Sequence, residues 1–117
     1  MFQEILQKVV DDVPGAAGVI FADWEGESVE YVSNGREEDI KLLGAHLGII
    51  LNLAREVAEN CAQGGIRGML VSSEAGRVVV QPVKEGYYLV MLLPSNGNIG
   101  VAFKKLREAS ELFMQEI

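Results

Sequence analysis

The sequence is poor in the residues on which most protein chemistry depends. Its 117 residues include one cysteine, one histidine and three prolines. A single cysteine excludes an intrachain disulfide and is typical of a reducing compartment. Ten basic residues stand against 17 acidic ones, and the resulting formal charge of −7 disfavours binding to a nucleic-acid backbone.

The sequence also lacks a recognisable signal peptide and a membrane span. The first twelve residues have neither a basic segment nor a long apolar core. The most apolar helical stretch, Glu37–Cys61, is too short for a span and carries His46, Asn52 and charges at both ends. Hydrophobic residues make up 49% of the chain and charged residues 23%, as in globular proteins. We expect a cytoplasmic protein whose residues 1–117 form a single domain.

Hydrophobic periodicity predicts three helices and five strands. Helices are indicated by apolar residues that recur every three or four positions, and strands by short apolar or alternating runs between glycine-containing turns. The predicted order is helix, two strands, helix, three strands, helix. The predicted segments are the helices Phe2–Val13, Glu37–Cys61 and Ile99–Phe113 and the strands Ala16–Trp24, Ser28–Ser33, Ile66–Ser73, Arg77–Val83 and Tyr87–Leu93.

Burial requirements predict how the strands are ordered. Only Ala16–Trp24 and Tyr87–Leu93 are apolar on both faces, so they should be neighbours at the centre of the sheet. Hairpin connections then give a mainly antiparallel five-stranded sheet of order 2-1-5-4-3. Helices must cover both of its faces. The expected fold class is α/β (α+β), as a three-layer α/β/α sandwich.

The long helix Glu37–Cys61 has more apolar surface than one contact requires. At 100° per residue, one face collects Ile40, Leu43, Leu47, Leu51, Ala54, Ala58 and Cys61. The opposite face collects Leu42, Ala45, Ile49 and Leu53. A helix on the surface of a globular protein normally has one apolar stripe. We therefore expect the second stripe to contact another chain, most simply a second copy.

The strand Ile66–Ser73 is expected to form an edge of the sheet directly after that helix. An exposed edge strand is a template for pairing with another chain. A two-fold dimer could use the spare stripe and the spare edge together. The predicted dimer interface contains Leu42, Ala45, His46, Ile49, Leu53, Arg67, Met69 and Val71.

No pattern in the sequence predicts an enzyme. His46 and Cys61 are roughly 22 Å apart along one helix, too far for a nucleophile–base pair. Ser95-Asn96-Gly97-Asn98 lacks the lysine of a phosphate loop, and capping of the last helix by Asn98 explains it more simply. The acidic residues that open the long helix have no second cluster of ligands. We expect no catalytic residue, no cofactor and no metal.

Several segments together resemble the Roadblock (dynein light-chain-like) domain family. They are the strand Gly18–Asp23, the turn Glu25-Gly26, Val80–Val83 before the Gly86 turn, and Asn98–Gly100 at the last helix. The resemblance covers essentially the whole chain and includes the order of helices and strands. The sequence is similar to the bacterial type that includes MglB, the gliding-motility partner of a Ras-like GTPase.

The resemblance implies a function as well as a fold. Family members are homo- or heterodimers built on the second helix and third strand, and they bind small Ras-like GTPases or act as adaptors. It implies a non-enzymatic dimeric module that regulates a Ras-like GTPase, and ordering of the GTPase's own switch loops is one route to such regulation. The alternative is a structural adaptor that bridges other proteins without affecting nucleotide turnover. A small-molecule sensor would need a polar pocket that the core pattern does not suggest.

Overall fold

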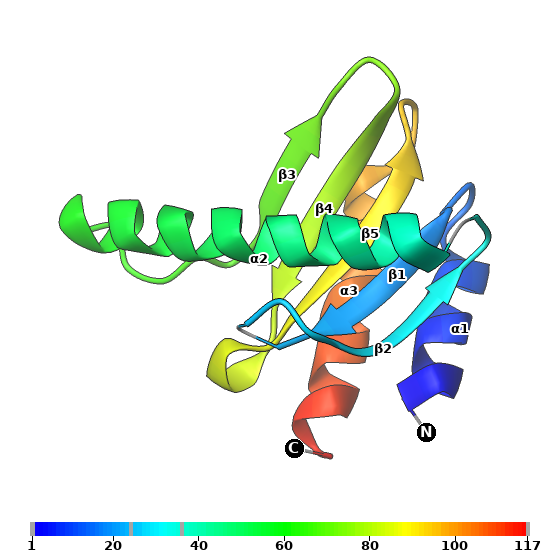
Figure 1. Cartoon of the computed structure of the whole chain (residues 1–117), viewed down its shortest axis with the longest axis horizontal. Helices are drawn as coiled ribbons and strands as arrows, with labels where there is room; N and C mark the ends of the chain where they lie inside the picture. The colour runs from blue at the N-terminus through cyan, green and yellow to red at the C-terminus, as the bar shows by residue number, and fades with distance from the viewer. Residues whose placement is uncertain (1, 24, 36, 117) are drawn as a thin grey trace.

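The computed structural model describes residues 2–23, 25–35 and 37–116, which form three α-helices, five strands and a short 3-10 turn (Figure 1). The predicted order of helices and strands is confirmed. The bounds are α1 Phe2–Asp12, β1 Gly18–Ala22, β2 Ser28–Ser33, α2 Glu37–Asn60, β3 Met69–Ser72, β4 Gly76–Pro82, η1 Lys84–Gly86, β5 Tyr88–Pro94 and α3 Ile99–Met114.

The five strands form one antiparallel sheet in the predicted order β2-β1-β5-β4-β3. The two strands that are apolar on both faces, β1 and β5, are neighbours at its centre, where Val19 lies opposite Met91. Helix α2 packs on one face, while α1 and α3 pack side by side on the other. The predicted three-layer α/β/α sandwich is therefore confirmed.

Two of the predicted strands are shorter in the structure. Strand β1 ends at Ala22 because the carboxylate of Asp23 accepts hydrogen bonds from the backbone N–H groups of Glu25 and Glu27, which turns the chain. Trp24 lies outside the described residues. The segment 66–68 was predicted as strand and is not one. The register of β3 would place residue 67 opposite Pro82, which ends β4 and has no N–H to donate.

The sheet separates two hydrophobic clusters, because neighbouring residues of a strand point to opposite faces. Between the sheet and α1 and α3, the Phe21 and Phe113 rings stack with centroids 4.3 Å apart, and Phe2 packs edge-on against both. The other cluster, under α2, includes Leu47 and Leu51.

Two glycines set how closely α2 approaches the sheet. A Cβ on Gly44 would lie 3.0 Å from Ile20, and a Cβ on Gly48 would overlap the hydroxyl of Tyr88. That hydroxyl donates a 3.0 Å hydrogen bond to the Gly44 carbonyl. This glycine pair therefore lets α2 pack closely on the sheet of the same chain.

Candidate functional site

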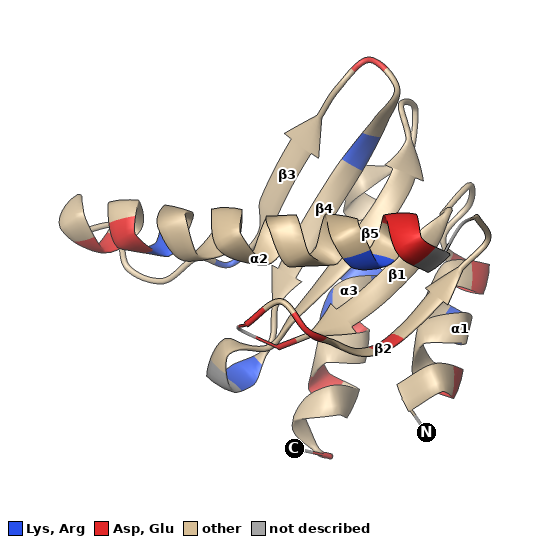
Figure 2. Ribbon diagram, viewed as in Figure 1, with Lys and Arg blue, Asp and Glu red and all other residues tan. Residues whose placement is uncertain are grey.

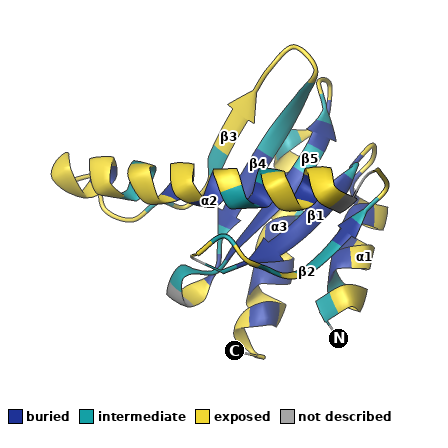
Figure 3. Cartoon of the chain, viewed as in Figure 1, coloured by how far each residue is buried: buried dark blue, intermediate teal, exposed yellow. Residues whose placement is uncertain are grey.

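The side of α2 that faces away from the sheet carries large apolar side chains exposed to solvent (Figure 3). The sheet-facing residues Ile40, Leu47 and Leu51 are buried, as predicted. On the outer side we define the α2 stripe as five residues whose side chains are 44–62% exposed. They are Leu42, Ile49, Ile50, Leu53 and Val57.

The charged residues of α2 lie near its two ends, and the stretch from Leu42 to Ala54 between them has none (Figure 2). No helix in the described ranges is long and apolar enough to cross a membrane. Monomeric proteins rarely expose an apolar patch of this kind unless it contacts another molecule. The α2 stripe is therefore a candidate interaction surface.

The position of α2 relative to the sheet places this surface at one edge. The helix packs on β1, β2 and β5, and its C-terminal half extends past the β3 edge without sheet beneath it (Figure 1). Leu53 and Val57 belong to this projecting half. A second molecule could therefore contact the projecting half of α2 and the β3 edge at the same time.

Strand β3 has one free edge among the described strands. It pairs with β4 alone, and Leu70 and Val71 are 42% and 43% exposed. The Ser73 N–H donates to the Gly76 carbonyl at 2.9 Å, so residues 73, 71 and 69 direct their backbone groups toward β4. By the same alternation, Leu70 and Ser72 direct theirs toward solvent. These groups can form hydrogen bonds with an added strand.

The residues predicted for the interface differ in how far they are exposed to solvent. Leu42, Ile49 and Leu53 are highly exposed on α2, and Val71 is exposed on β3. Met69 is half-buried and packs against the cluster under α2.

Two further predicted residues lie on the outer surface, and one is partly covered. His46 is exposed, with its Nδ1 3.0 Å from the Leu42 carbonyl oxygen, and Arg67 is exposed just before β3. Ala45 is half-buried, because the turn at Gly26 packs against its Cα.

The sequence prediction missed three exposed apolar residues of this surface, namely Ile50, Val57 and Leu70. Ile50 and Val57 continue the i, i+4, i+7, i+11 spacing that starts at His46, which was a detectable signal. Leu70 points to the opposite face of β3 from Met69 and Val71, and only the sheet register shows that this face is uncovered there.

The remaining candidate residues occupy structural positions. Periodicity placed Cys61 on the same face of the long helix as Leu47 and Leu51, but Cys61 is not buried with them. It is exposed, because the end of α2 projects beyond the sheet. The predicted cap of the last helix is confirmed by a 3.0 Å hydrogen bond from the Val101 N–H to the Asn98 side chain. The described residues contain no group of three His, Cys, Asp or Glu side chains placed to hold a metal.

Two arginines of the described residues make local hydrogen bonds at separate places. Arg77 donates to the Gly97 carbonyl at 3.0 Å, and Arg55 donates to Asn52 at 3.2 Å on α2. Arg36 lies outside the described residues.

Comparison with solved structures identifies the fold. A Roadblock/LC7 domain from Streptomyces avermitilis superposes with a TM-score of 0.90 at 13% identity, over 97% of this chain and 95% of that chain. MglB from Myxococcus xanthus gives 0.87 at 12% identity, over 99% and 96%. MglC from Myxococcus xanthus is 28% identical over 99% of this chain and 98% of that chain, with a TM-score of 0.69.

No curated protein sequence matches the chain. The family model of the Roadblock/LC7 domain matches residues 2–93, from α1 through most of β5. This chain is a member of the Roadblock/LC7 domain family.

Proposed function

We propose that this chain is a non-enzymatic binding module that forms a homodimer and, as a dimer, regulates a small Ras-like GTPase. The observation that carries the proposal is the presence of the α2 stripe and the free β3 edge on the same side of the molecule. The α2 stripe is apolar, and the β3 edge has unpaired backbone groups. A two-fold contact would bury both surfaces.

The spacing of the α2 stripe fits an antiparallel contact between two copies of α2. The stripe is symmetric about the point midway between Ile49 and Ile50. Leu42, His46 and Ile49 precede this point at the same distances along the sequence at which Val57, Leu53 and Ile50 follow it. A two-fold axis through that point therefore brings Leu42 opposite Val57 of the partner subunit. It also places His46 opposite Leu53 of the partner subunit. Such a self-complementary contact is what two-fold symmetry requires.

The free edge of β3 fits the same symmetry. Because Leu70 and Ser72 direct their backbone groups outward, two antiparallel copies of β3 can pair with Leu70 at the axis. The two five-stranded sheets would then form one continuous sheet of ten strands. The projecting half of each α2 would lie over the sheet of the partner subunit.

The GTPase part of the proposal is supported by family membership and by the likeness to MglB and MglC. Members of the Roadblock family bind small Ras-like GTPases or act as adaptors, and the likeness to MglB favours the first role here. A rigid dimer can regulate such a partner by favouring one conformation of its switch loops.

The first test measures the mass of the protein by light scattering after gel filtration. We expect twice the chain mass of 12.7 kDa. Ile49→Glu and Leu53→Glu should each give the mass of one chain, because the contact would bury an unpaired charge. Val29→Glu is the matched control, since Val29 is 43% exposed on the other edge strand, and it should stay dimeric. A dimer that persists in both α2 variants would refute this interface.

The second test measures binding to the Ras-like GTPases of the source organism, each loaded with GDP or with a non-hydrolysable GTP analogue. We expect the dimer to bind one nucleotide state more tightly and to change the rate of GTP hydrolysis. The monomeric Leu53→Glu variant serves as the control. Binding that is indifferent to the nucleotide, with no change in turnover, would instead identify a structural adaptor.

A further inference from the structure

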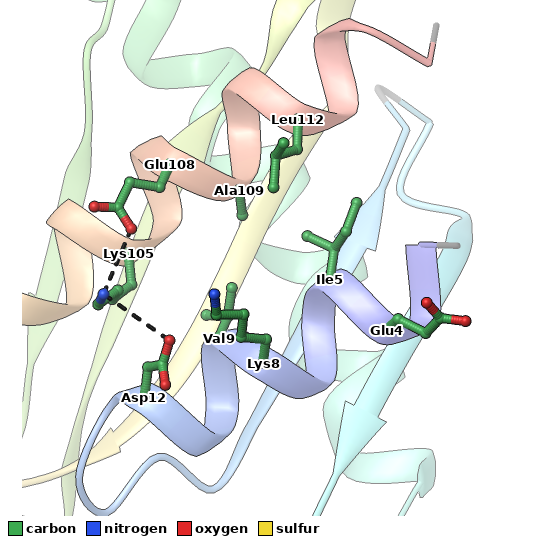
Figure 4. Close-up of a pocket in the computed structure, with 9 residues that line it drawn as sticks. All are labelled: Glu4, Ile5, Lys8, Val9, Asp12, Lys105, Glu108, Ala109 and Leu112. Carbon is green, nitrogen blue, oxygen red and sulfur yellow. Dashed lines mark ion pairs between the residues drawn. The ribbon is translucent and has the colours of Figure 1, made fainter.

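A groove runs between α1 and α3 on the opposite face of the sheet from α2 (Figures 1 and 4). It has a volume of about 270 Å³. Apolar side chains line it, among them Ile5 and Val9 of α1 and Ala109 and Leu112 of α3. Leu112 is 46% exposed, so the apolar lining is accessible from solvent.

One end of the groove is bridged by charges. The Lys105 amine lies 3.9 Å from the Asp12 carboxylate of α1 and 3.5 Å from the Glu108 carboxylate of α3 (Figure 4). This bridge joins the two helices beside the groove. Toward the other end, the groove lies open between Glu4 and Leu112.

Two opposite charges on the rim have no ionic partner among the described residues. Glu4 and Lys8 lie one turn apart on α1, and both are exposed. The Lys8 amine points toward the groove, whereas the Glu4 carboxylate points away from Lys8 (Figure 4). The rim as a whole is nearly neutral, with three acidic and two basic residues, although the chain carries −7.

We propose that this groove binds α1 of a second copy of the chain, and that the second copy binds α1 of the first in return. In an antiparallel pair of α1 helices, Glu4 of each copy lies beside Lys8 of the other. The unpaired charges thus satisfy each other under two-fold symmetry. A nearly neutral rim with alternating signs suits a second copy better than a strongly charged helix of another protein.

The contact is independent of the proposed α2 and β3 interface, because it uses the opposite face of the sheet. In the proposed dimer both grooves open on the same face of the ten-stranded sheet. Two dimers can therefore meet face to face, each α1 helix lying in a groove of the opposite dimer. The closed product contains four chains.

The test follows the mass of the intact protein by sedimentation as the concentration rises to about 1 mM, where a contact of millimolar affinity is half formed. We expect the mass to rise from two chains to four. Lys8→Glu and Glu4→Lys should each hold it at two, because like charges then meet across the axis. Both residues are exposed, so the thermal unfolding midpoint of each variant should match that of the unaltered protein.

Exchanging the charges of Glu4 and Lys8 within one chain provides a control for the proposed pairing. The double variant Glu4→Lys/Lys8→Glu should again reach four chains, since each copy still presents one charge of each sign. An equimolar mixture of the two single variants should do the same, whereas neither does so alone. Loss of the four-chain species in the single variants without recovery in the double variant would overturn the proposed pairing.

Substitutions made in the Leu53→Glu variant, in which the α2 and β3 interface is disrupted, test the groove contact by itself. If both contacts exist, Leu53→Glu should reach two chains at high concentration, and Leu53→Glu/Lys8→Glu should remain at one. A Leu53→Glu protein that stays at one chain while the unaltered protein stays at two would overturn the groove contact and leave the dimer intact. If Lys8→Glu abolishes binding of a different protein while the mass never exceeds two chains, the occupant is that protein and the proposal is wrong.

Discussion

At the scale of single residues, the end of α2 depends on an unusual backbone conformation. Ala62 has a φ of +57°, in the left-handed region that favours glycine. The Gln63 N–H donates to the Ala58 carbonyl at 2.8 Å, and the Ala62 N–H donates to the Glu59 carbonyl at 3.1 Å. These two hydrogen bonds form the usual glycine-based termination of a helix, here built on alanine.

We predict that Ala62→Gly stabilises the protein. Glycine removes the steric cost of the left-handed conformation, and the free energy of unfolding should rise by about 0.5–1 kcal/mol. Ala54→Gly, inside the same helix, is the control and should lower it by about 1 kcal/mol. Urea unfolding of the three proteins measures both changes. A decrease in both variants would contradict the role assigned to Ala62.

The contact between Gly48 and Tyr88 predicts a coupled pair of substitutions. Gly48→Ala should cost about 1–3 kcal/mol, because the new methyl group overlaps the Tyr88 hydroxyl. Tyr88→Phe should cost about 1 kcal/mol through loss of the hydrogen bond to Gly44. The double variant should lose less stability than the two single changes together, because removing the hydroxyl relieves the closest overlap and leaves the Tyr88 Cζ position 2.8 Å from the new methyl group. Strict additivity in urea unfolding would argue against the contact.

Tyr88 also predicts a loss of stability at alkaline pH. Burial, followed by the negative charge of Asp23, raises the pKa of the Tyr88 hydroxyl from 10.0 to about 12. Between these values the unfolded chain has released the proton and the folded chain retains it, so stability falls as the pH rises. The contribution is fully present below pH 10 and is lost toward pH 12.

The measurement compares the free energy of unfolding of the unaltered protein and Tyr88→Phe between pH 9 and pH 11.5. The unaltered protein should lose about 2 kcal/mol of stability relative to the variant by pH 11.5. Effects of other titrating groups cancel in the difference. Parallel pH profiles would show that Tyr88 titrates normally in the folded state.

At the scale of secondary-structure elements, the backbone N–H groups of β3 point alternately toward β4 and toward solvent. Proline substitutions in β3 can therefore test dimerisation separately from folding. The Leu70 N–H faces solvent, so Leu70→Pro removes no hydrogen bond to β4 and the monomer should retain its fold. It should nevertheless prevent dimerisation, because the proposed strand pairing uses that N–H. Val71→Pro removes an N–H directed toward β4 and should also destabilise the β3–β4 hairpin. Light scattering and circular dichroism together distinguish the two. A dimeric Leu70→Pro protein would exclude pairing through β3.

At the scale of the whole molecule, the proposed dimer links stability to concentration. If only the folded chain dimerises, dimerisation stabilises it by mass action, and the apparent unfolding temperature should rise with protein concentration. Calorimetry over a hundredfold range of concentration measures this dependence. Below the millimolar concentrations at which the groove contact forms, Leu53→Glu should unfold at a temperature that does not vary with concentration. A constant midpoint in the unaltered protein would contradict an obligate dimer.

Local pattern was sufficient to predict most of the fold. The order of helices and strands and the sheet order 2-1-5-4-3 followed from periodicity and from the two doubly apolar strands. Segment ends were less predictable, since they depend on partners that are distant in the sequence. Strand β3 begins only at Met69, because a strand that began earlier would have to pair with Pro82, and β1 stops where the Asp23 side chain turns the backbone.

Periodicity is enough to show that α2 has two apolar faces, because it places Leu47 and Ile49 on different sides of a helix. Which of the two faces the chain covers depends on how α2 packs on the sheet. Gly44 and Gly48 allow one face to approach Ile20 and Tyr88, which leaves the α2 stripe exposed. The groove between α1 and α3 has no sequence signature, because it is formed by two helices from opposite ends of the chain that meet only after both pack on one sheet.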